Sequence, residues 1–310
     1  LARVNHLAVL ASPGGGKSTL VKRLATAYSF PTRRLEISDE LPAHEWLPLY
    51  LRCRDLRDRS NRPVLELLHG IAAFANMSEA QGRCFRTSVS EALRSGSALL
   101  LVDGLDEISD EGSRRTFAQN LRTFVAMFPN VSLVVTSRVA GFRDVAGVIA
   151  GTCQQVTLAP LDETDVRRLC VSWHVEVVAD TDKVRAEAGE LAAYIWNNRH
   201  IRNLVENPLL LTTLLVVKRS NGEIPPTRAE LYSEAVRVLV RTWNVEGYAP
   251  LDERETLARL SYVACAMMQR GIQLIGNTAL VKLLHEAASE MEPELQFARV
   301  SPSEFIQRIE

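Results

Sequence analysis

The chain has 310 residues, which is long for one small domain, so two or three domains are expected. Its hydrophobic content of 46% and charged content of 24% are those of a soluble globular protein. The net charge of −1 gives no overall basic field, so we expect no direct binding to nucleic acid or to an anionic membrane.

The first residues and the cysteines bear on whether the chain is part of a longer protein and on its cellular compartment. Leu1 is not an initiator Met and lies almost on the first predicted strand, so we expect a piece of a longer polypeptide. No signal peptide is visible. The five cysteines are far apart and include no CxxC pair, which favours reduced thiols in the cytoplasm over a disulfide frame or a metal site.

A glycine-rich loop, ASPGGGKST, runs from the strand-like residues 6–10 into the helix-like residues 20–24. Its three glycines allow backbone N–H groups to face an anion, and the following helix adds its positive dipole end. Lys17 supplies a charge for the β- and γ-phosphates, and Ser18 a hydroxyl for Mg²⁺. Ala11 replaces the usual first glycine of such a P-loop. The residues predicted to bind a nucleoside triphosphate are Ala11, Ser12, Pro13, Gly14, Gly15, Gly16, Lys17, Ser18 and Thr19.

Residues 1–158 alternate short apolar runs with amphipathic stretches. The predicted strands are 7–10, 47–51, 98–102, 133–136 and 156–158. The amphipathic, helix-like stretches between them include 63–76, 79–95 and 112–127. Strands separated by helices predict a parallel sheet with helices on both faces, and a ligand site beyond the carboxyl ends of the strands.

Residues 98–108, ALLLVDGLDEI, place acidic groups after a predicted strand. The strand delivers Asp103 to its end, where a carboxylate can hold Mg²⁺ through water. Asp106 or Glu107 can orient and deprotonate the attacking water. An acid here favours the additional-strand class of P-loop ATPases over GTPases and small-molecule kinases. Taken alone, the turn is equally consistent with a solvated acidic loop.

Residues 133–138, LVVTSR, end a further predicted strand in polar groups. Arg138 would then lie beside the first strand, where it can sense or stabilise charge on the γ-phosphate. The alternative is an arginine that merely caps the sheet edge.

After Pro160 only helical patterns continue, at 162–173, 182–197, 208–218, 227–244, 252–270 and 277–290. The longest apolar run, residues 209–217, is half a membrane span and contains two threonines, so it predicts a buried helix. Asn221-Gly222 and Pro225-Pro226 mark a boundary near residue 222. The predicted domains are 1–160, which is α/β, and two helical ones, 161–222 and 223–310, the last incomplete.

Arginines are concentrated after the second predicted strand, at Arg52, Arg54, Arg57, Arg59 and Arg62. Asp55 and Asp58 are interleaved with them, and no aromatic partner is present. This pattern favours a solvated, self-compensated face over a contact with a subunit or with nucleic acid.

The order of these motifs, continued by VTLAPLDETDVRRLCVSW, NPLLLTTLL and IPPTRAELYSEAV, resembles a bacterial NACHT domain. NACHT domains belong to the STAND class of signal-transduction ATPases, which also includes NOD-like receptors. The resemblance implies an α/β P-loop domain with a five-stranded parallel sheet, a helical domain and a partial winged-helix domain that enclose ATP or ADP with Mg²⁺. It implies roles for Lys17 and Ser18 on phosphate and Mg²⁺, and for Asp103 on the metal. It further implies hydrolysis by Asp106 and Glu107, a sensor role for Arg138, and packing of Pro208 on the adenine.

The resemblance leaves two family features without a counterpart in the chain. The segment before the P-loop that helps hold adenine is reduced to residues 1–5. The winged-helix histidine is expected beyond Glu310, because His285 in LLHEAASE lacks its context.

Together these features predict a cytoplasmic ATPase switch that self-associates when ATP is bound, with effector and sensor domains on other parts of a longer chain. The first alternative is an AAA+-like remodelling or nucleic-acid-dependent ATPase. The second is a nucleotide-dependent scaffold that does not hydrolyse.

Overall fold

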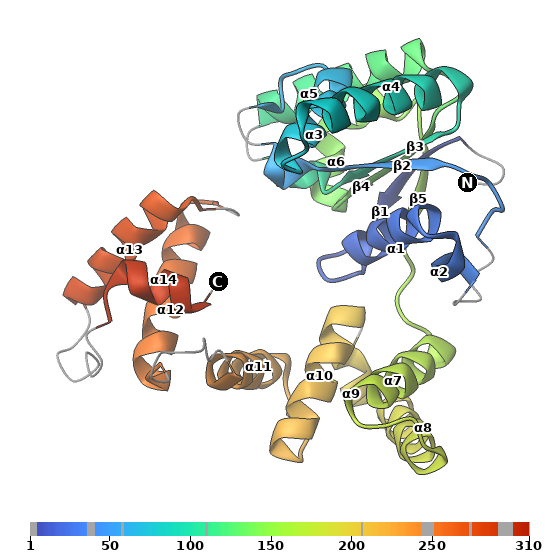
Figure 1. Ribbon diagram of the computed structural model, residues 1–310. Helices are drawn as coiled ribbons and strands as arrows, with labels where there is room; N and C mark the ends of the chain where they lie inside the picture. Colours follow the sequence, from blue (N-terminus) through green and yellow to red (C-terminus); the bar gives the residue numbers. More distant parts are fainter. Residues whose placement is uncertain are drawn as a thin grey trace. The chain divides into compact units, whose positions relative to one another are not determined.

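The computed structural model describes residues 5–35, 41–56, 59–108, 111–205, 207–242, 251–272, 275–290 and 300–309. The chain divides between Ala159 and Pro160 into two compact units, and each is described by itself. Figure 1 shows the elements of both units along the chain.

The first unit is built on a five-stranded parallel sheet with the strand order β2-β3-β4-β1-β5. The strands are β1 (His6–Leu10), β2 (Leu47–Arg52), β3 (Ala98–Asp103), β4 (Ser132–Ser137) and β5 (Gln154–Thr157). Every residue of β3 and β4 is buried. Central strands of a parallel sheet are covered on both faces, which explains why their sequences are nearly continuous apolar runs.

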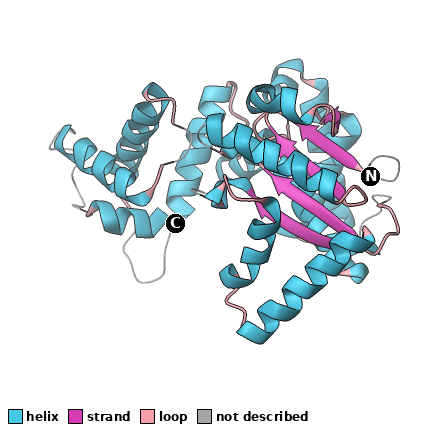
Figure 2. Cartoon of the chain, turned by 90° about the horizontal axis from the view of Figure 1, so that it is seen from above, coloured by secondary structure: helices cyan, strands magenta, loops and turns pink. Residues whose placement is uncertain are grey.

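Helices cover both faces of this sheet, as Figure 2 shows from above. Their bounds are α1 (Lys17–Ser29), α2 (Pro31–Leu35), α3 (Val64–Phe74), α4 (Glu79–Ser95), α5 (Glu111–Met127) and α6 (Val139–Ile149), with short 3-10 turns η1 (Cys53–Asp55) and η3 (Leu105–Glu107). One core includes Val21 and Leu24 of α1 against the sheet. A second core joins α3 to α6 on the other face, with Phe117 and Phe142 among its buried residues.

Local sequence signals explain where several helices begin. In α4, Ser78 Oγ accepts a hydrogen bond from the Gln81 N–H, and Gln81 Oε1 accepts one from the Ser78 N–H. This reciprocal capping box satisfies two amide donors that a helix start would otherwise leave unpaired. Asp162 and Asp165 repeat the arrangement at the start of the second unit.

The second unit is helical throughout its described residues. Its helices are α7 (Glu163–Val177), α8 (Asp182–Asn197), α9 (Arg199–Leu204), α10 (Pro208–Asn221), α11 (Arg228–Thr242), α12 (Glu253–Gln269), α13 (Asn277–Glu290) and α14 (Pro302–Ile309). Leu231 of α11 is buried in the core formed by α7 to α10, and a separate core joins α12 to α14. Within the described residues, none of the helices has the length and apolar character needed to span a membrane.

The predicted α/β P-loop fold with five parallel strands followed by a helical region is confirmed. The domain boundary near residue 222 and the winged-helix assignment stay predictions. Helix α6 was not predicted, because Gly141 and Gly147 lower the helix propensity of its sequence.

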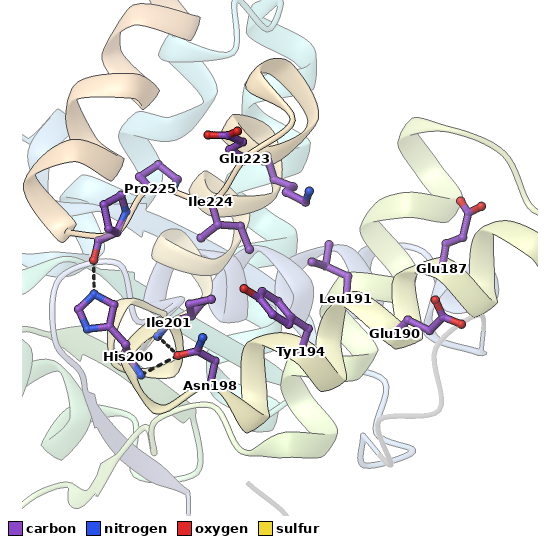
Figure 3. Close-up of a pocket in the computed structure, with 12 residues that line it drawn as sticks. Glu187, Glu190, Leu191, Tyr194, Asn198, His200, Ile201, Glu223, Ile224 and Pro225 are labelled. Atoms are coloured by element: carbon purple, nitrogen blue, oxygen red, sulfur yellow. Dashed lines mark hydrogen bonds between the residues drawn. The ribbon is translucent and has the colours of Figure 1, made fainter.

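The second unit contains an open cavity of about 720 Å³ between α8, α9 and the turn before α11 (Figure 3). Asn198 Oδ1 on its wall accepts from the amides of His200 and Ile201, and His200 Nε2 donates to the Pro226 carbonyl. These polar groups hold α9 to its neighbours. The lining of this cavity includes no residue predicted to bind nucleotide.

Candidate nucleotide-binding site

The predicted P-loop joins β1 to the first residue of α1 in a tight turn. Gly14 and Gly16 have φ angles of 75° and 90°, a region that residues with side chains rarely adopt. At Gly15, a Cβ would lie 3.0 Å from the Cβ of Ala11. Within the described part of the chain, the amides of Gly14 and Gly16 donate to no acceptor, so they are available to an anion.

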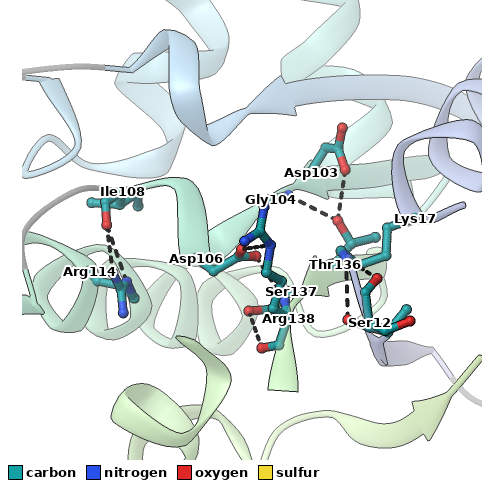
Figure 4. A network of polar contacts seen from close by, with 11 residues as sticks. Ser12, Lys17, Asp103, Gly104, Asp106, Ile108, Arg114, Thr136, Ser137 and Arg138 are labelled. Carbon is teal, nitrogen blue, oxygen red and sulfur yellow. Dashed lines mark hydrogen bonds and ion pairs between the residues drawn. The ribbon is translucent and has the colours of Figure 1, made fainter. Parts of the chain in front are cut away.

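Lys17 begins α1, and its side chain folds back over the loop. Nζ donates to the carbonyl oxygens of Ala11 at 3.3 Å and Ser12 at 3.2 Å (Figure 4). Burial lowers the pKa of Lys17 below its ordinary value, and the negative charge of Asp106 opposes this shift. Ser18 follows in the first turn of the helix and is exposed to solvent, as is Thr19.

Asp103 ends β3 as a buried carboxylate with only 4% exposure. Its Oδ1 accepts from Thr136 Oγ1 at 2.8 Å, and its Oδ2 accepts from Tyr50 Oη at 3.0 Å. Thr136 Oγ1 also accepts from the Gly104 N–H at 2.9 Å, as Figure 4 shows. Burial raises the pKa of Tyr50, so its hydroxyl keeps its proton and donates. Two neutral hydroxyls therefore fix both oxygens of Asp103.

Asp106 lies in η3 and is fully engaged with Arg138. Its Oδ1 accepts from the Arg138 backbone N–H at 2.8 Å, and its Oδ2 forms an ion pair with Arg138 Nε at 3.1 Å. The Asp106 side chain is 6% exposed, whereas that of Arg138 is 42% exposed. Asp106 therefore holds the arginine by both main chain and side chain at the end of β4.

Glu107, the next residue, is half-buried, and its backbone N–H donates to the Gly104 carbonyl at 2.8 Å. Its carboxylate has no hydrogen bond or ion pair to another described residue. It folds over Gly104, where a Cβ would lie 2.8 Å from Glu107 Oε2. Burial raises the pKa of Glu107, and the negative charges of Asp103 and Asp106 raise it further. A carboxylate with a raised pKa and no partner is suited to accept a proton.

Helix α6 and Arg114 of α5 support the acidic turn. At Gly141, in the first turn of α6, a Cβ would lie 2.4 Å from the Asp106 Cβ, so only glycine allows this approach. Arg114 donates from Nη2 to the Ile108 carbonyl at 2.9 Å and from Nη1 to Asp144 Oδ2 at 2.5 Å. Arg114 thereby ties the end of the acidic turn to α6.

Three of the arginines at and after the end of β2 are paired with acids, and Arg59 donates to the Asp55 carbonyl at 3.1 Å. Arg52 and Arg54 lie 3.6 and 3.8 Å from Asp55, and Arg62 lies 2.6 Å from Glu66. Arg57 and Asp58 lie outside the described residues. Whether this face binds a partner stays a prediction.

Pro208 lies in the second unit as the first residue of α10. Asn207 Oδ1 accepts from the Leu210 N–H at 3.0 Å and caps this helix. A proline in the first helical position needs no ligand to explain it. Its contact with adenine stays a prediction.

The carboxyl edge of the sheet brings together the P-loop residues, Asp103, Asp106, Glu107 and Arg138. Three neighbours of these residues were not predicted: Tyr50, Thr136 and Gly141. Thr136 precedes Arg138 at the same strand end, so its position in the sequence could have indicated that it lies at the site. Tyr50 lies within an apolar strand and Gly141 within a helix, where periodicity alone indicates no site.

The donors present fit a nucleotide with Mg²⁺. Loop amides and Lys17 suit phosphate oxygens, and the Ser18 hydroxyl and Asp103 are hard oxygen donors of the kind Mg²⁺ prefers. In the described part of the chain, no three His, Cys, Asp or Glu side chains form a metal-binding group. Mg²⁺ sites in nucleotide-binding proteins typically use one or two carboxylates together with substrate phosphates and water.

Comparison with known proteins adds the family. The sequence model of the NACHT domain family matches residues 6–176, which is more than half of the chain. No curated protein sequence matches. Among solved structures, the Aeropyrum pernix ORC1 protein in complex with DNA is similar over 99% of this chain and 76% of its own, with 15% identity and a TM-score of 0.41. Drosophila ORC bound to DNA is similar over 96% and 72%, with 14% identity and a TM-score of 0.37.

At these scores the two structural likenesses carry no argument about this chain. The family model does, because it spans the whole sheet and continues into α7. NACHT domains are P-loop NTPases that bind nucleotide, typically with Mg²⁺, and are generally ATPases. The chain belongs to the NACHT family.

Proposed function

We propose that this chain is a slow ATPase that works as a molecular switch, with Glu107 as its general base. The observation that supports this is the difference between the two acids of η3. Both oxygens of Asp106 are bound to Arg138, whereas the carboxylate of Glu107 has no hydrogen-bond or ion-pair partner in the described residues. A general base needs an oxygen that the attacking water can approach. The Asp106 carboxylate is 6% exposed and paired with a cation, whereas the Glu107 carboxylate is half-buried and has no such partner in the described part of the chain.

The other groups then have separate tasks. Lys17 and the loop amides would bind the phosphates, and Asp103, fixed by Thr136 and Tyr50, would accept from water on Mg²⁺. Bound Mg²⁺ neutralises charge on the phosphate oxygens. Arg138 stabilises charge that develops during transfer, and Asp106 positions Arg138 for this task.

Single-turnover hydrolysis tests this assignment. Glu107→Gln should keep ATP affinity and slow hydrolysis by about 10²–10⁴-fold, because it removes a base and leaves the phosphate cradle intact. Glu111→Gln, at an exposed glutamate four residues on, is the control and should hydrolyse at the wild-type rate. Unchanged rates in both Glu107→Gln and Asp106→Asn would place the base elsewhere.

The biological output that we propose is nucleotide-controlled self-association in signalling or defence, with hydrolysis as the reset. The NACHT family supports this proposal, as does a helical second unit that follows the nucleotide domain. Light scattering on the full-length protein with ADP and with ATP tests it. A monomer under both conditions, with fast turnover, would favour an ordinary ATP-using enzyme.

The same measurements separate the alternatives. Turnover stimulated by DNA or RNA would favour a remodelling or nucleic-acid-dependent ATPase. ATP binding without any hydrolysis would favour a scaffold.

A further inference from the structure

The hydroxyl of Tyr50 lies at the end of an apolar region on the sheet face that α1 covers. Tyr50 packs against the core that α1 forms with the sheet, beside Leu99 and Leu101. A phenylalanine would make the same apolar contacts. The hydroxyl instead reaches across to β3, where it lies 3.0 Å from Asp103 Oδ2.

The strand register explains how two side chains of β2 converge on this carboxylate. Arg52 is paired directly with Asp103, and Tyr50 is paired with Leu101, two residues earlier on β3. Arg52 Nε donates to Tyr50 Oη at 3.4 Å, and the guanidinium lies 5.7 Å from the Tyr50 ring centre. The three groups therefore form a row at the end of β2 and β3.

Hydrogen-bond chemistry gives this row a direction. A guanidinium can only donate, and an ionised carboxylate can only accept. The Tyr50 hydroxyl has one proton, so it must accept from Arg52 and donate to Asp103. Its proton is thereby directed at Asp103 Oδ2, while Thr136 holds Oδ1.

We infer that Tyr50, oriented by Arg52, is a positioning residue that sets the Asp103 carboxylate for Mg²⁺. A carboxylate held at both oxygens cannot rotate, and each oxygen keeps a lone pair for water on the metal. Groups that orient the direct ligands of a metal typically change metal affinity by 10–100-fold when they are removed. Asp103 would contact Mg²⁺ through water, so we expect an effect at the low end of that range. This inference rests on the proposed function, because it concerns Mg²⁺ at the same site.

The test measures ATP binding by calorimetry on the 310-residue chain, first in excess EDTA and then over a series of Mg²⁺ concentrations. Tyr50→Phe keeps the ring and removes the hydroxyl. It should leave the ATP affinity in EDTA unchanged. It should raise by about tenfold the Mg²⁺ concentration at which ATP affinity reaches half of its Mg²⁺-dependent increase. Arg52→Met should raise the same Mg²⁺ concentration by a smaller factor, because the Tyr50 hydroxyl remains.

Tyr28→Phe is the matched control. Tyr28 lies on α1, and its hydroxyl donates at 3.0 Å to the Pro42 carbonyl, so the variant loses a hydrogen bond of similar length away from Asp103. Tyr28→Phe should follow the wild-type Mg²⁺ curve. If Tyr50→Phe acted only through a loss of stability, the two variants would give the same curve. A wild-type curve for Tyr50→Phe would overturn the inference. Failure of the wild-type protein to bind ATP at any Mg²⁺ concentration would instead overturn the proposed function.

Discussion

In the first unit, the buried carboxylates Asp103 and Asp106 lie at the sheet edge and are held by hydroxyls and by a half-exposed arginine. In the second unit, the buried carboxylate of Glu255 is paired with Arg259, and both side chains are at most 5% exposed. Arg259 also donates to the Val300 carbonyl at 2.8 Å and lies over the Phe305 ring. Its Nε and Nη1 have no hydrogen-bond partner among the described residues.

This difference separates buried charge that can serve a ligand from buried charge that serves only the fold. The first unit keeps Lys17 and Glu107 partly accessible beside its fixed carboxylates, so a ligand can complete the arrangement. The pair in the second unit lies on α12, is almost fully buried, and contacts Val300 and Phe305. Substitutions at the site of the first unit should therefore alter ATP binding. Substitutions at the buried pair of the second unit should alter stability.

The largest effect is expected at the enclosed pair. Arg259→Met removes the cation that pairs with the buried Glu255 carboxylate and should lower the free energy of unfolding by about 3–5 kcal/mol, with ATP affinity unchanged. Arg83→Met is the control, since Arg83 also pairs with a glutamate four residues away, Glu79, but at 61% exposure. It should cost at most about 0.5 kcal/mol in urea denaturation. A fall in ATP affinity in Arg259→Met would show that the two units are not independent.

The opposite result is expected at Lys17. Lys17→Ala removes a charged donor to the phosphates and should weaken ATP binding by about 3 kcal/mol, on the order of a hundredfold. Its free energy of unfolding should change by less than about 0.5 kcal/mol. Lys22→Ala, at an exposed lysine on the same helix, should bind ATP as the wild type does. Equal calorimetric affinities of Lys17→Ala and wild type would remove Lys17 from the site.

A substitution at Gly141 should affect both stability and chemistry in the first unit. Its Cβ would lie 2.4 Å from the Asp106 Cβ, so Gly141→Ala must displace α6 or η3 and should cost about 1–3 kcal/mol. Hydrolysis should slow as well, because Asp106 positions Arg138. Gly147→Ala in the same helix meets nothing within 4 Å and should stabilise by about 0.5–1 kcal/mol. Similar thermal unfolding of the two variants would contradict the close approach.

The smallest effect concerns pH. Because burial raises the pKa of Glu107, its carboxylate becomes protonated at a higher pH than an ordinary glutamate does. If Glu107 is the base, hydrolysis should fall as the solution is acidified, starting above the usual glutamate range. This acid limb should be absent from the residual hydrolysis of Glu107→Gln. An identical limb in that variant would assign it to another group.

The sequence predicts most of the sheet because burial on both faces demands continuous apolar runs, as in residues 98–102. It predicts Lys17, Asp103 and Arg138 because each follows a predicted strand at the edge where ligands bind. The contacts of Tyr50 and Gly141 depend on strand register and on helix approach, which no local pattern encodes. The proposed preference for Glu107 over Asp106 depends on tertiary contacts, because adjacent acids are equivalent until one of them has a partner.

Strand order has a consequence for the synthesis of the protein. β1 pairs with β4 and β5, which follow it by more than a hundred residues. At usual elongation rates β1 therefore leaves the ribosome on the order of ten seconds before either partner exists. Both of its edges stay open during that time, and open apolar edges invite pairing with other chains. We therefore expect nascent chains that end before β4 to be the aggregation-prone species, and the P-loop to form only after β4 has been made.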